Sequence, residues 1–169
     1  MKSVLISIKP KWVDKSIIGE KTIEVRKTSP KEVPFKCYIY MSQGDLKDLG
    51  SYSEWIYKNR MRVIGEFICD KVYKIEPIFS FYYCYSGYDD SSDCSYFEDY
   101  SIDNERLKKT CLTQQDLCVY GNGKTLYGWH ISDLKIYDKP LSLSKLGVTC
   151  PPQSWKYVEE LENEQRTAD

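Results

Sequence analysis

Histidine is almost missing from this 169-residue chain, which holds a single one, His130. A metal site made of several imidazoles is therefore excluded, and a Ser-His-Asp triad would have to be built around that one residue. The seven cysteines are odd in number and form no C-x-x-C pair, so they indicate neither a disulfide framework nor a four-cysteine zinc site. We expect reduced thiols, no metal site and no cofactor.

Long apolar runs are missing too. No stretch approaches the roughly 20 apolar residues of a membrane-spanning helix. The apolar start of the chain is too short, and too soon interrupted by Lys9, for a signal peptide. We therefore expect a cytoplasmic protein without membrane contact. Its length suits one domain over residues 1–158, followed by a flexible polar tail at 159–169.

Basic residues are missing from one part of the chain. Residues 76–105 contain 8 Asp and Glu but no Lys or Arg, whereas residues 1–75 carry 15 Lys and Arg against 9 Asp and Glu. The first part therefore has the charge to attract phosphate, and the acidic part would repel it. Solvated surface without a ligand explains the same charges, so charge alone leaves both interpretations open.

The acidic part includes a segment near residues 78–103 that is rich in Tyr, Ser and Asp. We interpret this segment as an insertion into the domain. It can serve as a lid, as a surface for a protein partner through residues 79–100, or as a tolerated loop. Its charge argues against phosphate contact.

Hydrophobic periodicity predicts the remaining elements. Residues that alternate between apolar and polar predict strands, and residues with helical spacing and end signals predict short helices. The expected strands are residues 4–8, 21–27, 35–42, 62–75 and 127–132, and the expected helices are residues 10–18, 53–59, 104–109 and 113–120. Strands in this number, with small helices at the crossovers, predict an α+β fold or a mainly-β barrel.

Local signals refine three of these elements. Gly19 stands where a helix needs a left-handed C-terminal residue. Ser51 and Glu54 have the spacing of a capping box, and Thr113 precedes the last helix as a cap. Gly65, inside a long apolar strand, indicates a bulge or a bend.

The second expected strand carries the candidate site. Glu24 and Arg26 are two residues apart and therefore point to one face, with Lys21 at the entrance of the strand. Lys9 ends the neighbouring strand at the same rim, so we expect all four side chains to converge in one cleft. The cations would hold a phosphate, and Glu24 would accept from a base edge or act as a general base. The alternative is an exposed, ion-paired rim that contributes about 1 kcal/mol or less per pair.

Several aromatic side chains are candidates for stacking on a base. They are Tyr38 and Tyr40, on the predicted outward face of the third strand, and Trp12 and Trp129. We include Tyr40 and Trp129 among the binding residues. Burial of Trp129 in the core is the alternative, because Trp129 alternates with His130 and only one of the two faces the cleft.

Several stretches together resemble the ASCH domain, a branch of the PUA-like superfamily. The block Gly-Glu-Lys-Thr-Ile-Glu-Val-Arg-Lys at residues 19–27 is the most specific of them in this context. The other stretches are residues 6–10, 63–67, 129–134 and 151–155. The resemblance covers most of the chain apart from roughly residues 78–103 and the tail. It implies a PUA-like β-barrel, a mixed pseudobarrel of about five or six strands with short helices at the crossovers, and a basic cleft beside the block.

The resemblance also implies a choice of functions. ASCH-like proteins include RNA-binding modules, proposed ribonucleases and amidohydrolases of acetylated cytidine. Lys21 matches the catalytic lysine of the amidohydrolases, but Glu24 stands where they carry a threonine nucleophile. We therefore expect a domain that binds RNA or a modified nucleoside or nucleotide through Lys9, Lys21, Glu24, Arg26, Tyr40 and Trp129. The alternatives are a nucleic-acid or nucleoside hydrolase that uses Lys21 and Glu24 as catalytic residues, and a protein-interaction domain.

Overall fold

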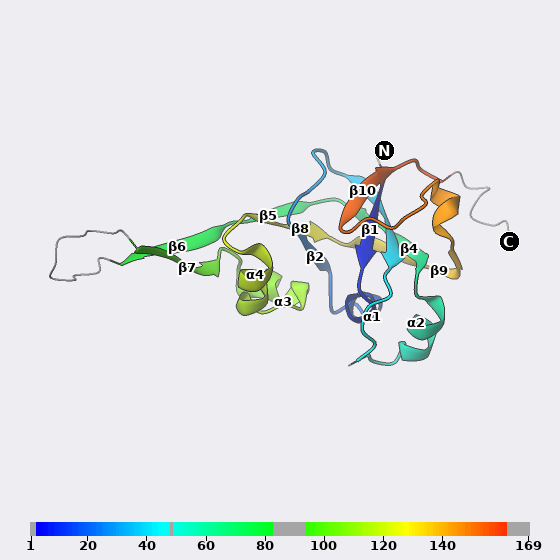
Figure 1. Ribbon diagram of the computed structural model, residues 1–169, viewed down its shortest axis with the longest axis horizontal. Helices are drawn as coiled ribbons and strands as arrows, with labels where there is room; N and C mark the ends of the chain where they lie inside the picture. The colour runs from blue at the N-terminus through cyan, green and yellow to red at the C-terminus, as the bar shows by residue number, and fades with distance from the viewer. Residues whose placement is uncertain (1–2, 48, 83–93, 162–169) are drawn as a thin grey trace.

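The protein has a mixed α+β fold built on two main sheets (Figure 1). The computed structural model describes residues 3–47, 49–82 and 94–161. Short helices interrupt the series of strands along the chain. In order they are β1 (Ser3–Ile8), α1 (Pro10–Ile17), β2 (Ile23–Arg26), β3 (Phe35–Met41), α2 (Ser53–Asn59), β4 (Arg62–Cys69), β5 (Val72–Ile75), β6 (Pro77–Tyr82), β7 (Cys94–Tyr100), α3 (Asn104–Thr110), α4 (Gln114–Gly121), β8 (Leu126–His130), β9 (Ser132–Leu141), the 3-10 helix η1 (Leu143–Leu146) and β10 (Trp155–Val158).

The sheets stay open. The larger sheet has the strand order β10-β1-β3-β4-β9, and the smaller has the order β2-β8-β5. The chain passes from one sheet to the other where β8 ends and β9 begins, at Ile131, so a continuous backbone rather than a hydrogen-bonded ladder joins the sheets. The α+β prediction is confirmed, but the predicted barrel is wrong, because among the described strands no sheet closes on itself.

The main core lies between the two sheets. Phe35, Cys37, Ile39 and Met41 point into it from β3, as their alternation predicts, and each is at most 2% exposed. Residues of β1 and β4 complete one wall, and Trp129 of β8 enters from the smaller sheet. This core fixes the inner face of the smaller sheet, on which the candidate site is built.

The outer face of the larger sheet is also buried, contrary to the prediction for β3. Tyr38 and Tyr40 are 0% and 5% exposed, in a second cluster that includes Leu146 and Leu161. The Tyr38 hydroxyl also accepts a hydrogen bond from the backbone N–H of Leu161 at 3.0 Å. The C-terminal segment therefore covers this face, and part of the predicted tail packs on the domain; residues 162–169 lie outside the described residues.

The helix signals have mixed outcomes. The predicted cap at Thr113 is confirmed, since Thr113 and Asp116 form a reciprocal capping box at the start of α4. The predicted capping box at Ser51 and Glu54 is wrong, because the N-cap of α2 is Tyr52 and no side chain caps it.

Helices α3 and α4 pack on the outer face of the smaller sheet in a third apolar cluster. Among the described residues, no helix is long and apolar enough to cross a membrane.

The flanks of the predicted insertion are paired strands. β6 and β7 form an antiparallel two-stranded ribbon that projects from one end of the molecule (Figure 1). Tyr100 anchors its base, because the Tyr100 hydroxyl donates to the carbonyl of Lys124 at 2.7 Å. A side chain at Gly121 would clash with this anchor, since its Cβ would lie 1.7 Å from the Tyr100 hydroxyl oxygen. The middle of the insertion, residues 83–93, lies outside the described residues.

Candidate functional site

The turn between α1 and β2 delivers Lys21 to the inner face of the smaller sheet. Gly19 adopts a φ of 78°, which suits glycine, and its N–H bonds the carbonyl of Ser16 at 3.1 Å. The predicted left-handed glycine is therefore confirmed. The next turn is fixed by the Lys21 N–H, which donates to the carbonyl of Lys15 at 3.0 Å. Lys21 thus has a defined position two residues before β2 begins.

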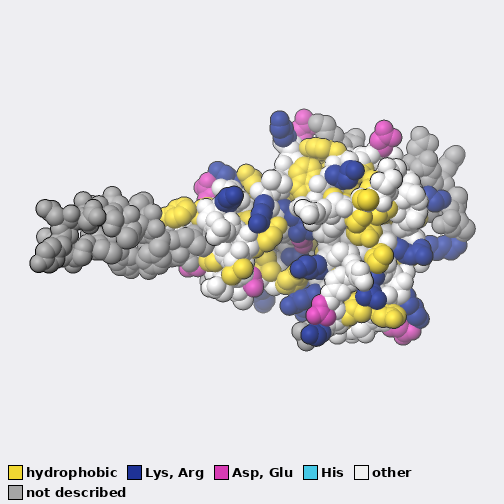
Figure 2. Space-filling model, in the orientation of Figure 1, with side chains coloured by type: hydrophobic (Ala, Val, Ile, Leu, Met, Phe, Trp, Pro, Cys, Tyr) yellow, Lys and Arg dark blue, Asp and Glu magenta, His cyan; other side chains and the backbone are white. Residues whose placement is uncertain are grey.

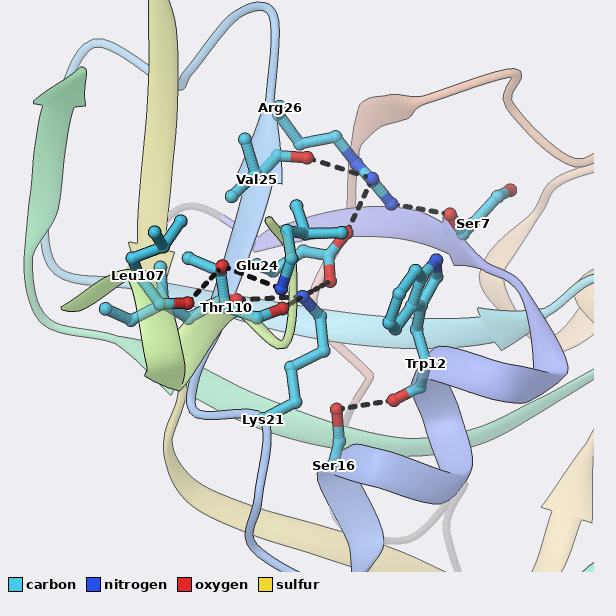
Figure 3. Close-up of polar contacts among 11 residues, drawn as sticks. Ser7, Trp12, Ser16, Lys21, Glu24, Val25, Arg26, Leu107 and Thr110 are labelled. Atoms are coloured by element: carbon cyan, nitrogen blue, oxygen red, sulfur yellow. Dashed lines mark hydrogen bonds and ion pairs between the residues drawn. The ribbon is translucent and has the colours of Figure 1, made fainter. Parts of the chain in front are cut away.

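Lys21 is buried and contacts acceptors of the chain itself (Figure 3). Its residue is 2% exposed. Its Nζ donates to the carbonyls of Ile23 at 2.9 Å and Thr110 at 2.6 Å, and lies 3.4 Å from Glu24 Oε2. Thr110 is the last residue of α3, so its carbonyl belongs to the negative end of that helix. The helix end and the carboxylate together compensate the buried ammonium charge.

Glu24 and Arg26 share one face of β2, as the strand period predicts. Glu24 is 3% exposed, and its Oε1 lies 2.5 Å from Arg26 Nη1. Arg26 Nη2 reaches across to the larger sheet and donates to the carbonyl of Ser7 at 2.7 Å. Glu24 is therefore held between two cations, and Arg26 links β2 to β1 (Figure 3).

The three ionic side chains come from the region where β2 faces β1 and α1, and the cations among them outnumber the carboxylate. Figure 2 shows a hollow between β2 on one side and β1 and α1 on the other, with Lys or Arg and Asp or Glu atoms at its floor. Trp12 of α1 forms part of the surroundings, because Lys21 Nζ and Lys11 Nζ lie 5.2 and 4.9 Å from the centroid of its ring. A carboxylate in this hollow is thus the minority charge among several cations.

Unpartnered polar atoms gather at the same place. Five buried side-chain nitrogen or oxygen atoms in the described part of the chain make no hydrogen bond, and three of them are Glu24 Oε2, Arg26 Nε and Trp129 Nε1. Glu24 and Trp129 are directly paired across β2 and β8, so their side chains leave the sheet on one face. Buried polar atoms without a hydrogen bond are rare and costly. Three of the five such atoms of the described residues therefore belong to Glu24, Arg26 and the cross-strand neighbour of Glu24.

The predicted convergence of four side chains is realised for three. Lys21, Glu24 and Arg26 meet, whereas Lys9 is exposed at the N-cap of α1 and makes no hydrogen bond or ion pair with these three described residues. The alternative of an exposed rim is wrong, because α3 and the facing sheet bury the cluster. Sequence reasoning missed the carbonyls of Thr110 and Ser7, since backbone groups carry no residue signal.

The two aromatic candidates differ in position. Trp129 is fully buried and packs edge-on against Phe35 and Trp155, with ring centroids 5.1 and 5.6 Å apart. Its ring is therefore part of the core, and its buried Nε1 makes no hydrogen bond. Tyr40 packs in the cluster on the outer face of the larger sheet, remote from the hollow, because the C-terminal segment covers that face. We correct the prediction for Tyr40 accordingly.

Two other reactive side chains, His130 and Cys111, are not members of the ion-paired cluster. His130 alternates with Trp129 and instead contacts Asp70, with 2.6 Å between His130 Nδ1 and Asp70 Oδ1. This hydrogen bond lowers the pKa of Asp70. Burial raises the pKa of the Cys111 thiol, although Lys21 opposes the effect. That thiol therefore stays protonated at neutral pH and is a poor nucleophile.

Comparison with known proteins places the fold. No protein-family model and no curated protein matches the chain. Crystal structures of ASCH from Zymomonas mobilis are similar to it at 18% identity, with a TM-score of 0.58 over 97% of this chain and 90% of that one. A Tyr-to-Phe mutant of the same protein gives 0.57 over 98% and 94% at 18% identity. The chain thus has the fold of the ASCH domain structures, a PUA-like fold, as its sequence resemblance indicates.

Proposed function

We propose that this protein binds RNA or a nucleoside or nucleotide in the hollow at Lys21, Glu24 and Arg26. The observation that carries the proposal is the concentration of unpartnered buried atoms there: one acceptor on Glu24 and donors on Arg26 and Trp129. A ligand that offers both a donor and an acceptor at one planar edge completes this set. Nucleobases have such edges, and proteins read them in unpaired RNA through side-chain hydrogen bonds.

The charge of the surroundings supports the same ligand class. Lys21 and Arg26 outnumber Glu24 within the cluster, and Lys11 adds a further cation beside Trp12. Sequence charge points the same way, with 15 basic against 9 acidic residues in positions 1–75. Cations of this kind position the phosphates of a nucleic acid, while the base edge supplies specificity.

The arrangement of Lys21 supports binding over the hydrolase alternative. Its Nζ faces three acceptors of the chain, the carbonyls of Ile23 and Thr110 and the carboxylate of Glu24. Two of the three ammonium hydrogens are donated to backbone carbonyls, so Lys21 is held mainly by the fold itself. We assign Lys21 a positioning role, in which it holds Glu24 in place.

The proposal is tested by binding of single-stranded RNA, measured by fluorescence anisotropy. We expect Arg26→Gln to weaken binding about 5- to 150-fold, as the loss of about 1 to 3 kcal/mol predicts, and to make the salt dependence shallower by about 0.7 units per lost phosphate contact. Lys36→Gln is the matched control. Lys36 also has a 13% exposed side chain in an ion pair, but that pair is with Glu160 of the C-terminal segment.

Two results would contradict the proposal. One is a wild-type protein that binds neither RNA nor any of a panel of plain and modified nucleosides. The other is an Arg26→Gln variant, folded by circular dichroism, that binds as tightly as the Lys36→Gln control.

A further inference from the structure

A second basic pocket lies immediately beyond the end of β2. It has a volume of about 440 Å³, and its lining includes Lys27, Thr28, Ser29, Lys31, Val72 and Tyr127. Two of these residues connect it to the candidate site through the sheet register. Tyr127 is the cross-strand partner of Arg26, and Val72 is the partner of Trp129. Directly paired residues share a face, so Tyr127 and Val72 lie on the face of the smaller sheet that carries Glu24 and Arg26, and the pocket borders that face at the end of β2.

The chemistry of this pocket is that of an anion site. Lys27 and Lys31 supply two cations, and no carboxylate belongs to its lining. Two other pockets in the described part of the chain differ in this respect, since Asp103 lines one and Glu66 and Asp133 line the other. Glu32 follows Lys31 in the loop but does not line the pocket.

Neighbouring contacts hold the loop in place. The Thr28 hydroxyl accepts a hydrogen bond from Trp155 Nε1 at 2.9 Å, which leaves its own O–H to donate. Lys27 Nζ lies 4.9 Å from the centroid of the Tyr120 ring. The loop is thus tied both to β10, which belongs to the larger sheet, and to α4. A tethered loop with two lysines and a hydroxyl donor is suited to a tetrahedral oxyanion.

We propose that this pocket binds a phosphate of the same RNA strand whose base lies in the hollow. Glu24 and Lys27 are three residues apart, about 10 Å along an extended strand, a distance that an extended RNA strand covers with a few nucleotides. The ligand is then a single-stranded RNA rather than a free nucleoside. This inference rests on the proposed function and deepens it.

The test uses the full chain and the double variant Lys27→Ala/Lys31→Ala. The control is Lys135→Ala/Lys156→Ala, which removes two exposed lysines from β9 and β10 and so changes the net charge equally. The probes are a labelled nine-nucleotide single-stranded RNA and the four ribonucleosides, which lack phosphate. Binding is measured by anisotropy and calorimetry at several salt concentrations.

We expect the Lys27→Ala/Lys31→Ala variant to lose about 10-fold or more in RNA affinity at low salt. Its plot of log affinity against log salt is expected to be shallower by about 1.4, or about 0.7 for each of two phosphate contacts. Nucleoside affinity stays within about twofold, because nucleosides carry no charge for these lysines to bind.

Two distinct results would overturn the inference. If the pocket variant and the control bind RNA with the same affinity and salt slope, the pocket is not a phosphate site. The proposed function then still stands, provided that Arg26→Gln weakens RNA binding. If the wild type binds neither probe, the proposed function fails and the inference fails with it, and that outcome is recognised before any variant is measured.

Discussion

Two groups of charges lie close together in this fold and differ in almost every physical respect. The Lys21–Glu24–Arg26 cluster is buried, with side chains 2%, 3% and 13% exposed. The pair between Lys109 and Glu105 on α3 is 47% and 79% exposed. The two meet at the end of α3, where Lys21 bonds the carbonyl of Thr110, the residue after Lys109.

The comparison teaches that similar sequence spacing can produce different roles. Both groups place opposite charges two to four residues apart, and on sequence evidence both suit a solvated surface. Water screens the α3 pair, so the pair has little effect on stability. The buried cluster instead depends on a complete set of partners, because a buried charge that loses its partner is strongly destabilising. The cluster therefore couples the candidate site to the fold.

The largest effect is expected for Lys21→Ala. This change leaves Glu24 with one cation and removes the donor from two buried carbonyls, so we expect a loss of about 3 to 5 kcal/mol in the free energy of unfolding. Urea denaturation followed by circular dichroism measures it. A loss no larger than that of an exposed lysine would mean that the cluster is not the structural centre described above.

A smaller effect is expected for Glu24→Gln. The amide keeps the shape of the side chain and one acceptor, but Lys21 and Arg26 lose their counter-charge. We expect a loss of about 1 to 3 kcal/mol in the free energy of unfolding. Equal unfolding midpoints for Glu24→Gln and the wild type would show that the carboxylate charge contributes nothing to the fold.

The pair between Asp70 and His130 is expected to have a still smaller effect, visible only in acid. The hydrogen bond from His130 lowers the pKa of Asp70 in the folded state. The stability it contributes is therefore present above the ordinary Asp pKa and is lost as the pH falls through the lowered value. Solvent screens this half-exposed pair, so the contribution stays below about 1 kcal/mol. The stability of Asp70→Asn, measured by thermal unfolding between pH 2 and 5, should decrease less with falling pH than that of the wild type. If the stability of Asp70→Asn depends on pH in the same way as that of the wild type, the pair between Asp70 and His130 does not contribute to acid stability.

The smallest effect is expected for Lys109→Ala, the exposed counterpart of Lys21→Ala. Its partner Glu105 stays fully solvated, so we expect an unfolding midpoint equal to that of the wild type at moderate salt. A clear destabilisation that persists in high salt would remove the contrast between the two groups of charges.

Sequence patterns predict much of this architecture for local reasons. The period of two places Glu24 and Arg26 on one face, and glycine at position 19 predicts the left-handed turn before Lys21. Both signals arise within a few residues of the chain, so no tertiary information is needed to read them. The mixed α+β class follows from the same kind of evidence.

The missed features depend on segments far away in the chain. Lys21 is buried because α3 ends against it, and Tyr40 is buried because the C-terminal segment covers the outer face of β3. Whether the sheets close depends on which strands pair. β8 belongs to the smaller sheet and β9 to the larger one, with Ile131 between them. The pairing of β6 with β7 joins a mainly apolar segment, Pro77–Tyr82, to a more polar one, Cys94–Tyr100, and the residues of neither segment specify the other as its partner.

The most direct test of the central claim, that the buried carboxylate of Glu24 reads a ligand, is a calorimetric comparison of Glu24→Gln with Glu66→Gln. Both glutamates are buried, at 3% and 5% exposed, but Glu66 accepts from the Tyr137 hydroxyl on the larger sheet. The probes are ribonucleosides and short single-stranded RNAs, used where both variants are folded. We predict that Glu24→Gln changes which base is preferred or abolishes binding, while Glu66→Gln binds like the wild type. Identical affinities and base preferences in the wild type and both variants would contradict the claim and leave the cluster with a structural role alone.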